Sequence, residues 1–156
     1  MRRKEREVTQ PDELLTIISE CKVCRIAIHD EPYPYIVPLN FGYSYNNNQL
    51  IFYFHTAKVG KKIELLKLNP HVCVELDTNH ELVSGEIACQ YTYKYQSIIG
   101  FGKVEFVEDI EDKINALNHL MKHQTNSDEV FTYSPKQVEM IGVIKIVIDS
   151  FQGKQS

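Results

Sequence analysis

Two adjacent lysines, Lys61 and Lys62, follow a strand-like apolar segment and stand in the first turn of a predicted helix. The N-terminal end of a helix is partially positive, so a cation there costs a few tenths of a kcal/mol to about 1 kcal/mol. A bound anion would reverse this effect, because the ammonium groups and the free backbone N–H groups would converge on it. The pattern predicts an anion site, and a solvated lysine cluster is the alternative that the segment leaves open.

His55 and Thr56 end the strand that leads into these lysines. An imidazole can donate a proton near neutral pH, so His55 is the candidate acid. The alternative is that His55 only hydrogen-bonds a ligand or a neighbouring chain. Thr56 could add its hydroxyl to the bound anion, or it could simply end the strand.

Apolar periodicity predicts the helices and strands that position these residues. Helices are expected from Thr9 as N-cap to about Lys22, over 60–68 and 109–123, and as a short turn at Ser134. Strands are expected over 24–29, 35–43, 50–54, 72–77, 87–95 with 96–107, and 140–151, with a connecting loop over 79–86.

About six strands at short spacing indicate a mainly β protein with flanking helices, in which an antiparallel sheet closes into a small barrel as a single domain over 1–156. Pro38 cannot donate a ladder hydrogen bond, so its strand is expected at an edge or with a bulge. Gly100 and Gly102 indicate a bend or bulge in a later strand.

The composition excludes several classes of protein. A net charge of −4 argues against general nucleic-acid binding, although Arg2, Arg3, Lys4 and Arg6 form a local basic cluster. The chain has no run of eighteen apolar residues, so no membrane span is predicted. Its charged start argues against a secretory signal. We therefore expect a cytoplasmic protein without nucleic-acid or membrane partners.

The cysteines and two histidines allow further chemistry but favour packing. Cys21 and Cys24 have the CxxC spacing of redox and zinc sites, yet no second CxxC follows, and Cys73 and Cys89 alternate within strands. All four are interpreted as small core residues. His119 and His123 stand four apart on a helix, a metal-ligand spacing, but surface positions near the helix end are favoured.

Several motifs together resemble one known family. They are Arg2-Arg3-Lys4, Lys22-Val23-Cys24-Arg25, Tyr35–Gly42, Phe54-His55-Thr56, Gly60-Lys61-Lys62, Asn69–Glu75, Tyr95–Gly102 and Gly153-Lys154. Over essentially its whole length the chain resembles the pyridoxamine 5′-phosphate oxidase-like split-barrel flavoproteins, in particular their nitroimidazole-resistance (nitroimidazole reductase) branch.

The resemblance implies a six-stranded antiparallel split barrel that dimerises and binds FMN in clefts shared between subunits. Carried over by position, Lys61 and Lys62 would grip the FMN phosphate, and His55 and Thr56 would sit at the adjacent strand end. The remaining implied cofactor-binding residues are Val37, Pro38, Leu39 and Asn40 along one strand, and Ser97 near the flavin.

The resemblance also implies an activity: FMN-dependent reduction of small electron-poor substrates such as nitroimidazoles, with electrons from a nicotinamide nucleotide or another donor and His55 as the proton donor. The chain contains no tryptophan, so it lacks the Trp-containing end of the vitamin B6 oxidase. That oxidase activity is one alternative, and a non-catalytic flavin- or haem-binding protein is another.

Two further features have open interpretations. Some split-barrel relatives bind haem, so His71 could be a haem ligand, or it could be a turn residue after Pro70. Tyr91, Tyr93 and Tyr95 alternate on one strand face and could form a dimer interface, part of the core or a substrate cage.

Overall fold

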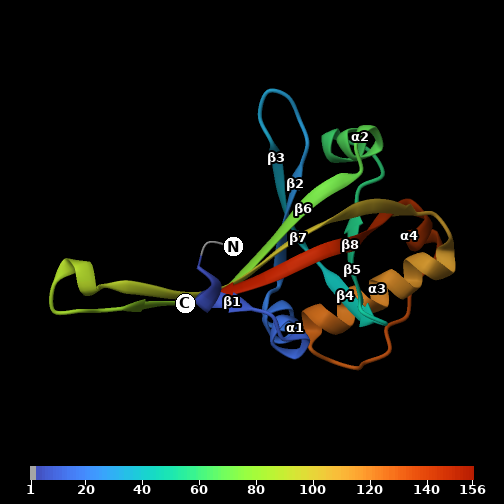
Figure 1. Cartoon of the computed structure of the whole chain (residues 1–156). Coiled ribbons are helices and arrows are strands. Elements are labelled where there is room, and N and C mark those ends of the chain that lie inside the picture. Colours follow the sequence, from blue (N-terminus) through green and yellow to red (C-terminus); the bar gives the residue numbers. More distant parts are fainter. Residues whose placement is uncertain (1–2) are drawn as a thin grey trace.

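Alternating apolar residues build one antiparallel sheet in the computed structural model, which describes residues 3–156 (Figure 1). Arg2, part of the expected basic cluster, lies outside the described residues. The elements are η1 (Lys4–Arg6), β1 (Glu7–Val8), α1 (Pro11–Glu20), β2 (Val23–Ile28), β3 (Tyr35–Asn40), β4 (Gly42–Asn46), β5 (Gln49–Thr56), α2 (Lys61–Leu68), β6 (His71–Val83), η2 (Ala88–Gln90), β7 (Thr92–Val107), α3 (Ile110–Thr125), α4 (Pro135–Met140) and β8 (Gly142–Gln155).

The strands lie in the order β3-β2-β6-β7-β8-β5-β4, and β1 pairs with β8. The predicted class, mainly antiparallel β with flanking helices, is confirmed, but the sheet has eight strands rather than six. The expected strand over 35–43 is two strands, because Phe41 leaves the ladder and its side chain is completely buried. The short β1 has no apolar alternation of its own from which it could be predicted.

Aromatic side chains at the junction of β3, β4 and β5 fix the closure of the sheet. The Phe41 ring packs edge-on against Phe52, with 5.3 Å between ring centroids, and lies 6.4 Å from Phe54. Since β3 and β4 are the two edges of the sheet and only Phe41 separates them, burying this ring draws the edges together. Pro38 lies on the edge strand β3, as predicted.

The expected loop over 79–86 is wrong for most of its length. β6 continues to Val83 and pairs with β7, so the two strands form a long hairpin that projects from the body (Figure 1). A bulge between Thr78 and Glu81, with Asn79 at a positive φ of 56°, takes up the irregular residues that suggested a loop. We call the projecting part, residues 79–95, the arm.

Other local expectations have mixed outcomes. Gln10 rather than Thr9 precedes α1, and neither a side-chain cap nor a continuation to Lys22 is present in this helix. The predicted irregularity near Gly102 is confirmed, because the β7–β8 register shifts between Phe101 and Gly102. Within residues 3–156, no helix combines the length and the apolar character needed to cross a membrane.

Gly42→Ala tests how closely α3 packs on the start of β4. A Cβ atom at Gly42 would lie 2.3 Å from the backbone nitrogen of Leu120, so the helix would have to move. We expect the variant to lose about 1–3 kcal/mol of unfolding free energy in urea denaturation. The control Asn46→Ala, exposed on the same strand, should change it by less than about 0.5 kcal/mol; equal losses would contradict the packing argument.

Candidate functional site

An open pocket of about 400 Å³ lies where the end of β5 and the start of α2 face β3. Its lining is Tyr35, Leu39, His55, Thr56, Ala57, Val59, Gly60, Lys61 and Lys62. Five of the residues named from the sequence therefore meet in one place. A larger pocket of about 550 Å³ lies between α1, β4 and α3, but it contains none of them. We take the smaller pocket as the candidate site because it holds the uncompensated polar groups described next.

Lys61 is already balanced by an acidic residue. Its Nζ lies 2.7 Å from Oδ2 of Asp30, in the loop between β2 and β3, and 5.0 Å from the centroid of the Tyr35 ring. The ion pair raises the pKa of Lys61 and lowers the pKa of Asp30. Lys61 therefore ties the β2–β3 loop to α2, and little of its charge is free for a ligand.

Lys62 differs from its neighbour because its side chain is half-buried and no carboxylate among residues 3–156 pairs with it. Desolvation by the surrounding chain lowers the pKa of Lys62. Burying a cation without a counter-charge is unfavourable, and an anion in the pocket would remove that penalty. Of the two predicted lysines, Lys62 is thus the one poised for an anion.

Uncommitted hydrogen-bond donors surround Lys62. The Thr56 hydroxyl is buried and has no partner in the described chain, and a buried unpaired hydroxyl costs about 1–3 kcal/mol. Gly60, at a φ of 120°, precedes α2, and its carbonyl accepts from the N–H groups of Ile63 and Glu64 at 2.9 and 3.1 Å. The backbone N–H groups before Ile63 therefore precede the first bonded turn of the helix. A phosphate group fits this set of donors.

His55 lies on the rim of the pocket, exposed at the end of β5 and opposite Val143 of β8. Neighbouring side chains do not cover its imidazole, so both solvent and a pocket ligand can reach it. This placement is compatible with either role considered for His55, the proton donor or the hydrogen-bonding group.

The four candidate residues of β3 divide between two faces. Val37 and Leu39 point inward and pack against the core, and Leu39 also lines the pocket. Pro38 and Asn40 alternate with them and face outward. The Asn40 Nδ2 group donates to the carbonyl of Lys22 and to Gln124 Oε1, at 3.1 and 3.2 Å, so this amide is bound to α3 rather than directed into the pocket.

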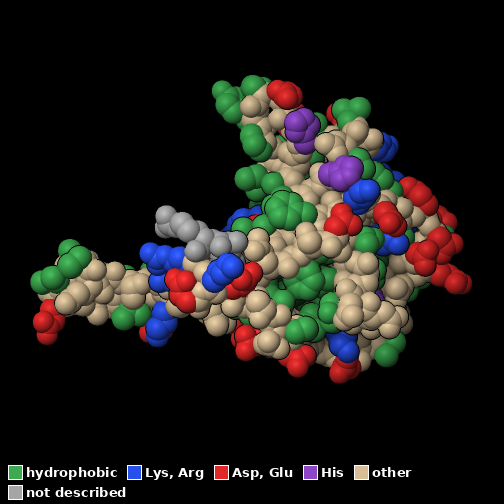
Figure 2. All heavy atoms as spheres, viewed as in Figure 1, with side chains coloured by type: hydrophobic (Ala, Val, Ile, Leu, Met, Phe, Trp, Pro, Cys, Tyr) green, Lys and Arg blue, Asp and Glu red, His purple; other side chains and the backbone are tan. Residues whose placement is uncertain are grey.

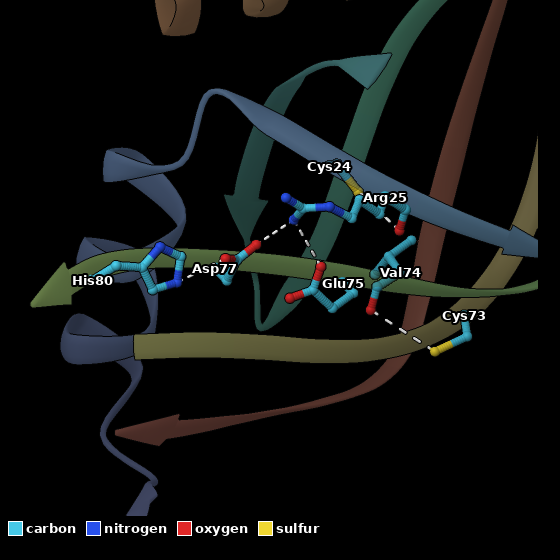
Figure 3. Close-up of polar contacts among 7 residues, drawn as sticks. All are labelled: Cys24, Arg25, Cys73, Val74, Glu75, Asp77 and His80. Carbon is cyan, nitrogen blue, oxygen red and sulfur yellow. Dashed lines mark hydrogen bonds and ion pairs between the residues drawn. The ribbon is translucent and has the colours of Figure 1, made fainter. Parts of the chain in front are cut away.

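Ser97 also faces outward, on β7, opposite Asp77 and outside the pocket lining. It belongs to the outer face of the sheet, where Arg25 of β2 reaches across to Glu75 and Asp77 of β6 (Figure 3). The Arg25–Glu75 contact is 3.0 Å, and His80 Nε2 lies 2.8 Å from the second oxygen of Asp77. Exposed apolar side chains surround these charges: Val23, Ile36, Ile99 and Phe101. Within one chain this outer face is uncovered.

Sequence reasoning missed Asp30 and Tyr35 as part of the site. Tyr35 was expected only as the first residue of a strand, and Asp30 lies between two expected strands; Asp30 reaches Lys61 only because the β2–β3 hairpin folds against α2. A carboxylate thirty-one positions away in the chain carries no local signal of this pairing. Knowledge of this ion pair would have shown that Lys61 has a counter-charge and Lys62 does not.

The surface interpretation of the histidine pair is wrong for His123. This side chain is buried against the Phe41 ring, 4.5 Å between centroids, and its Nε2–H donates to the Cys21 carbonyl at 2.7 Å. His119 stacks on Tyr53 at 4.8 Å. No cluster of three or more potential metal ligands occurs in the described part of the chain. The backbone N–H and the ring Nδ1 of His71 both lie 3.1 Å from Asn69 Oδ1, so this histidine is the first residue of β6 and is tied back to the turn that precedes the strand.

The interpretation as core residues holds for Cys21 and Cys24 but is wrong for Cys73, which is half-buried on the outer face of β6 opposite Phe101, and for Cys89. Cys21 and Cys24 are buried in the core, and desolvation raises the pKa of Cys21 to about 12 and that of Cys24 further. Burial also raises the pKa of the half-buried Cys73. Cys89 is exposed in η2 at the end of the arm, because the strand expected there does not form.

Comparisons with known proteins agree with this architecture. Residues 10–155 match the family model described as pyridoxamine 5′-phosphate oxidase. A candidate 5-nitroimidazole antibiotic resistance protein from Bacteroides thetaiotaomicron is 36% identical, with a TM-score of 0.81 over 96% of this chain and 86% of that one. No curated protein matches the sequence.

Two more distant structures share the fold. The flavocytochrome Anf3 from Azotobacter vinelandii is 15% identical, with a TM-score of 0.80 over 100% of this chain and 72% of that one. A FAD and heme binding protein from Mycobacterium smegmatis is 17% identical, with a TM-score of 0.80 over 97% and 73% of the two chains.

The buried histidines predict a specific pH dependence of stability. Desolvation lowers the pKa of His119 and of His123 below the ordinary value of 6.5, so the unfolded chain binds these protons more readily. Stability should therefore fall as the pH decreases below about 6.5, by up to about 1.4 kcal/mol per pH unit for each histidine. Urea denaturation between pH 7.5 and 5 measures this slope.

His123→Gln should reduce that slope, whereas His29→Gln, at an exposed position, should leave it unchanged. An acid slope of the same size in all three proteins would show that other groups cause it.

Proposed function

This chain belongs to the pyridoxamine 5′-phosphate oxidase family, and from that premise we propose that it binds FMN and reduces small electron-poor substrates such as nitroimidazoles. The observation that carries the proposal is the half-buried, unpaired Lys62 beside the orphaned Thr56 hydroxyl in the pocket between β3, β5 and α2. A relative 36% identical is described as a candidate 5-nitroimidazole resistance protein, which supports the substrate class.

The phosphate of FMN would bind at the start of α2. Lys62 would supply the cation and the Thr56 hydroxyl can donate, while the first N–H groups of the helix belong to the pocket-lining residues Lys61 and Lys62. Each hydrogen bond to a charged group contributes about 1.5–3 kcal/mol. Lys61 would act mainly through Asp30, by holding the β2–β3 hairpin and the Tyr35 ring against the pocket.

The flavin ring would lie along β3, where Tyr35 and Leu39 supply an apolar wall. The pocket is open, so one chain covers only one side of a planar ring. We propose that a second copy of the chain closes it in a homodimer, with the outer face that carries Pro38, Asn40 and Ser97 as the contact surface. The exposed apolar residues of this face support that choice.

Bound flavin would supply the redox chemistry, with electrons from a nicotinamide nucleotide or a similar donor. The chain itself would supply binding, exclusion of water and protons. Reduction of a nitro group consumes protons together with electrons, and the exposed His55 at the pocket rim is placed to deliver them.

Lys62→Ala tests the phosphate site. We expect the dissociation constant of FMN to rise about 10- to 100-fold, from the loss of 1.5–3 kcal/mol of charge-assisted bonding, as measured by fluorescence titration. Riboflavin, which lacks the phosphate, should bind the parent and the variant equally. Lys67→Ala removes the same charge from the other end of α2 and serves as the control. Equal FMN retention in the Lys62 variant and the parent would refute the assignment.

His55→Gln separates proton delivery from cofactor binding. The variant should keep its FMN, because the amide can still donate a hydrogen bond, but single-turnover reduction of a nitroimidazole by the reduced holoprotein should slow about 100-fold. His71→Gln, exposed and outside the pocket, should react at the parent rate. Unchanged single-turnover rates in the His55 variant would remove its proposed role.

A further inference from the structure

From Glu81 to Lys94 the arm is a two-stranded hairpin that pairs with no other strand of the described chain. The body holds only its base, where the Ser156 N–H donates to the Tyr95 carbonyl and Asn79 Nδ2 donates to Glu20. Beyond that base the two strands pair with each other alone, through Glu81–Lys94, Leu82–Tyr93 and Val83–Thr92. It projects away from the body, near the point where the chain ends (Figure 1). An isolated two-stranded hairpin is marginally stable in water, so a surface from elsewhere is needed to hold it.

The arm also exposes more apolar surface than a free hairpin should. Leu82, Ile87, Tyr91 and Tyr93 are each about half exposed or more, with Leu82 at 62%. Hydrophobic side chains gather at its free end, and basic ones stand at its base (Figure 2). Such residues on a projecting element are typical of an interaction site.

The apolar surface of the arm continues directly into the outer face of the body. Along β7, the side chains at alternate positions from 91 to 101 point to one side: Tyr91, Tyr93, Tyr95, Ser97, Ile99 and Phe101. The bulge lies in β6 between Thr78 and Glu81, so it does not interrupt this row. At about 3.3 Å per residue the row is roughly 33 Å long. The arm and the outer face are therefore one continuous surface.

The size of this surface matches a second copy of the chain. The four exposed apolar residues of the arm and the four of the outer face each offer ~100 Å², which gives ~800 Å² per partner, the area of a standard interface. The outer face alone would supply about half of that area. A stable dimer thus needs the arm as well.

The charges on this surface also favour self-association. Arg25 is paired with Glu75 and Asp77 on the outer face, whereas the Lys94–Glu81 pair, at 2.9 Å, lies on the opposite side of the arm. Because Arg25 partners both carboxylates, this surface keeps only one uncompensated negative charge, so two copies can meet with little like-charge repulsion. A partner recognised by charge would instead require a surface of one sign.

We propose that the arm is a clasp that packs on a second copy of this chain and extends the dimer contact beyond the outer face. The inference rests on the homodimer of the proposed function and adds the element that holds it. In a two-fold dimer each arm would reach over the body of its partner.

Charged substitutions on the apolar side of the arm test the clasp. The double variant Leu82→Glu/Tyr93→Glu alters a directly paired position, and Thr92→Glu places one charge on the opposite side of the same strand as a control. Sedimentation velocity over a range of concentrations should show a dimer dissociation constant at least tenfold higher for the double variant. The control should match the parent. Phe101→Glu, on the outer face, should also weaken the dimer.

Cys89 gives a second measurement on the unaltered chain. It is exposed at the tip of the arm, whereas Cys21 and Cys24 are buried and Cys73 is half-buried, so a nitroxide reagent should label Cys89 first. The electron paramagnetic resonance spectrum should show an immobilised label in the dimer and a mobile label after dilution to the monomer. Cys89→Ser should lose this signal.

The possible results separate the clasp from the proposed function. If the double variant dimerises like the parent and the Cys89 label stays mobile in the dimer, the clasp is refuted. If, in that case, Phe101→Glu alone dissociates the parent dimer and releases FMN, the proposed function stands without the clasp. A parent chain that binds FMN as a monomer at all concentrations refutes both the clasp and the shared cleft. A parent chain that stays monomeric while its arm binds an unrelated protein, with that binding lost in the Leu82→Glu/Tyr93→Glu variant, would also overturn the proposal.

Discussion

The burial of one aromatic ring determines where the candidate residues lie. Phe41 is the single residue between the two edge strands β3 and β4, and its ring is completely buried beside Phe52, Phe54 and His123. Because this ring must leave water, the edge strands converge and β3 turns toward the end of β5. The pocket, the wall formed by Tyr35 and Leu39, and the position of α2 all follow from that closure.

Burial also makes two identical neighbouring side chains different. Lys61 is exposed and balanced by Asp30, whereas Lys62 is half-buried and has no acidic partner in the described chain. An unpaired cation and the unpaired Thr56 hydroxyl lower the stability of the chain and raise its affinity for an anion. The same reasoning applies at the surface, where an open pocket, an uncovered sheet face and an apolar arm are unfavourable for a single chain. One dimeric, flavin-bound assembly would relieve all of them, which is why we propose it.

The sequence by itself determined the class of fold and the neighbourhood of the site. Alternating apolar residues predicted the strands, Pro38 predicted an edge, and the lysines after a strand end predicted a helix start with unusual charge. These signals are local, because side-chain periodicity and helix-end electrostatics act over a few residues. They were sufficient to place His55, Thr56, Lys61 and Lys62 together, since these residues are close in the chain.

Only the tertiary structure decided which residues share a face and which charges are free. The pairing of Asp30 with Lys61, the outward direction of Asn40 and Ser97, and the burial of His123 depend on contacts between segments far apart in the sequence. Residues 79–86 of the arm were read as a loop because Asn79 and its polar neighbours have turn character, yet pairing with β7 outweighs that local preference as far as Val83. Local patterns cannot report such contacts, because the energy that decides them comes from surfaces that meet only when the sheet has closed.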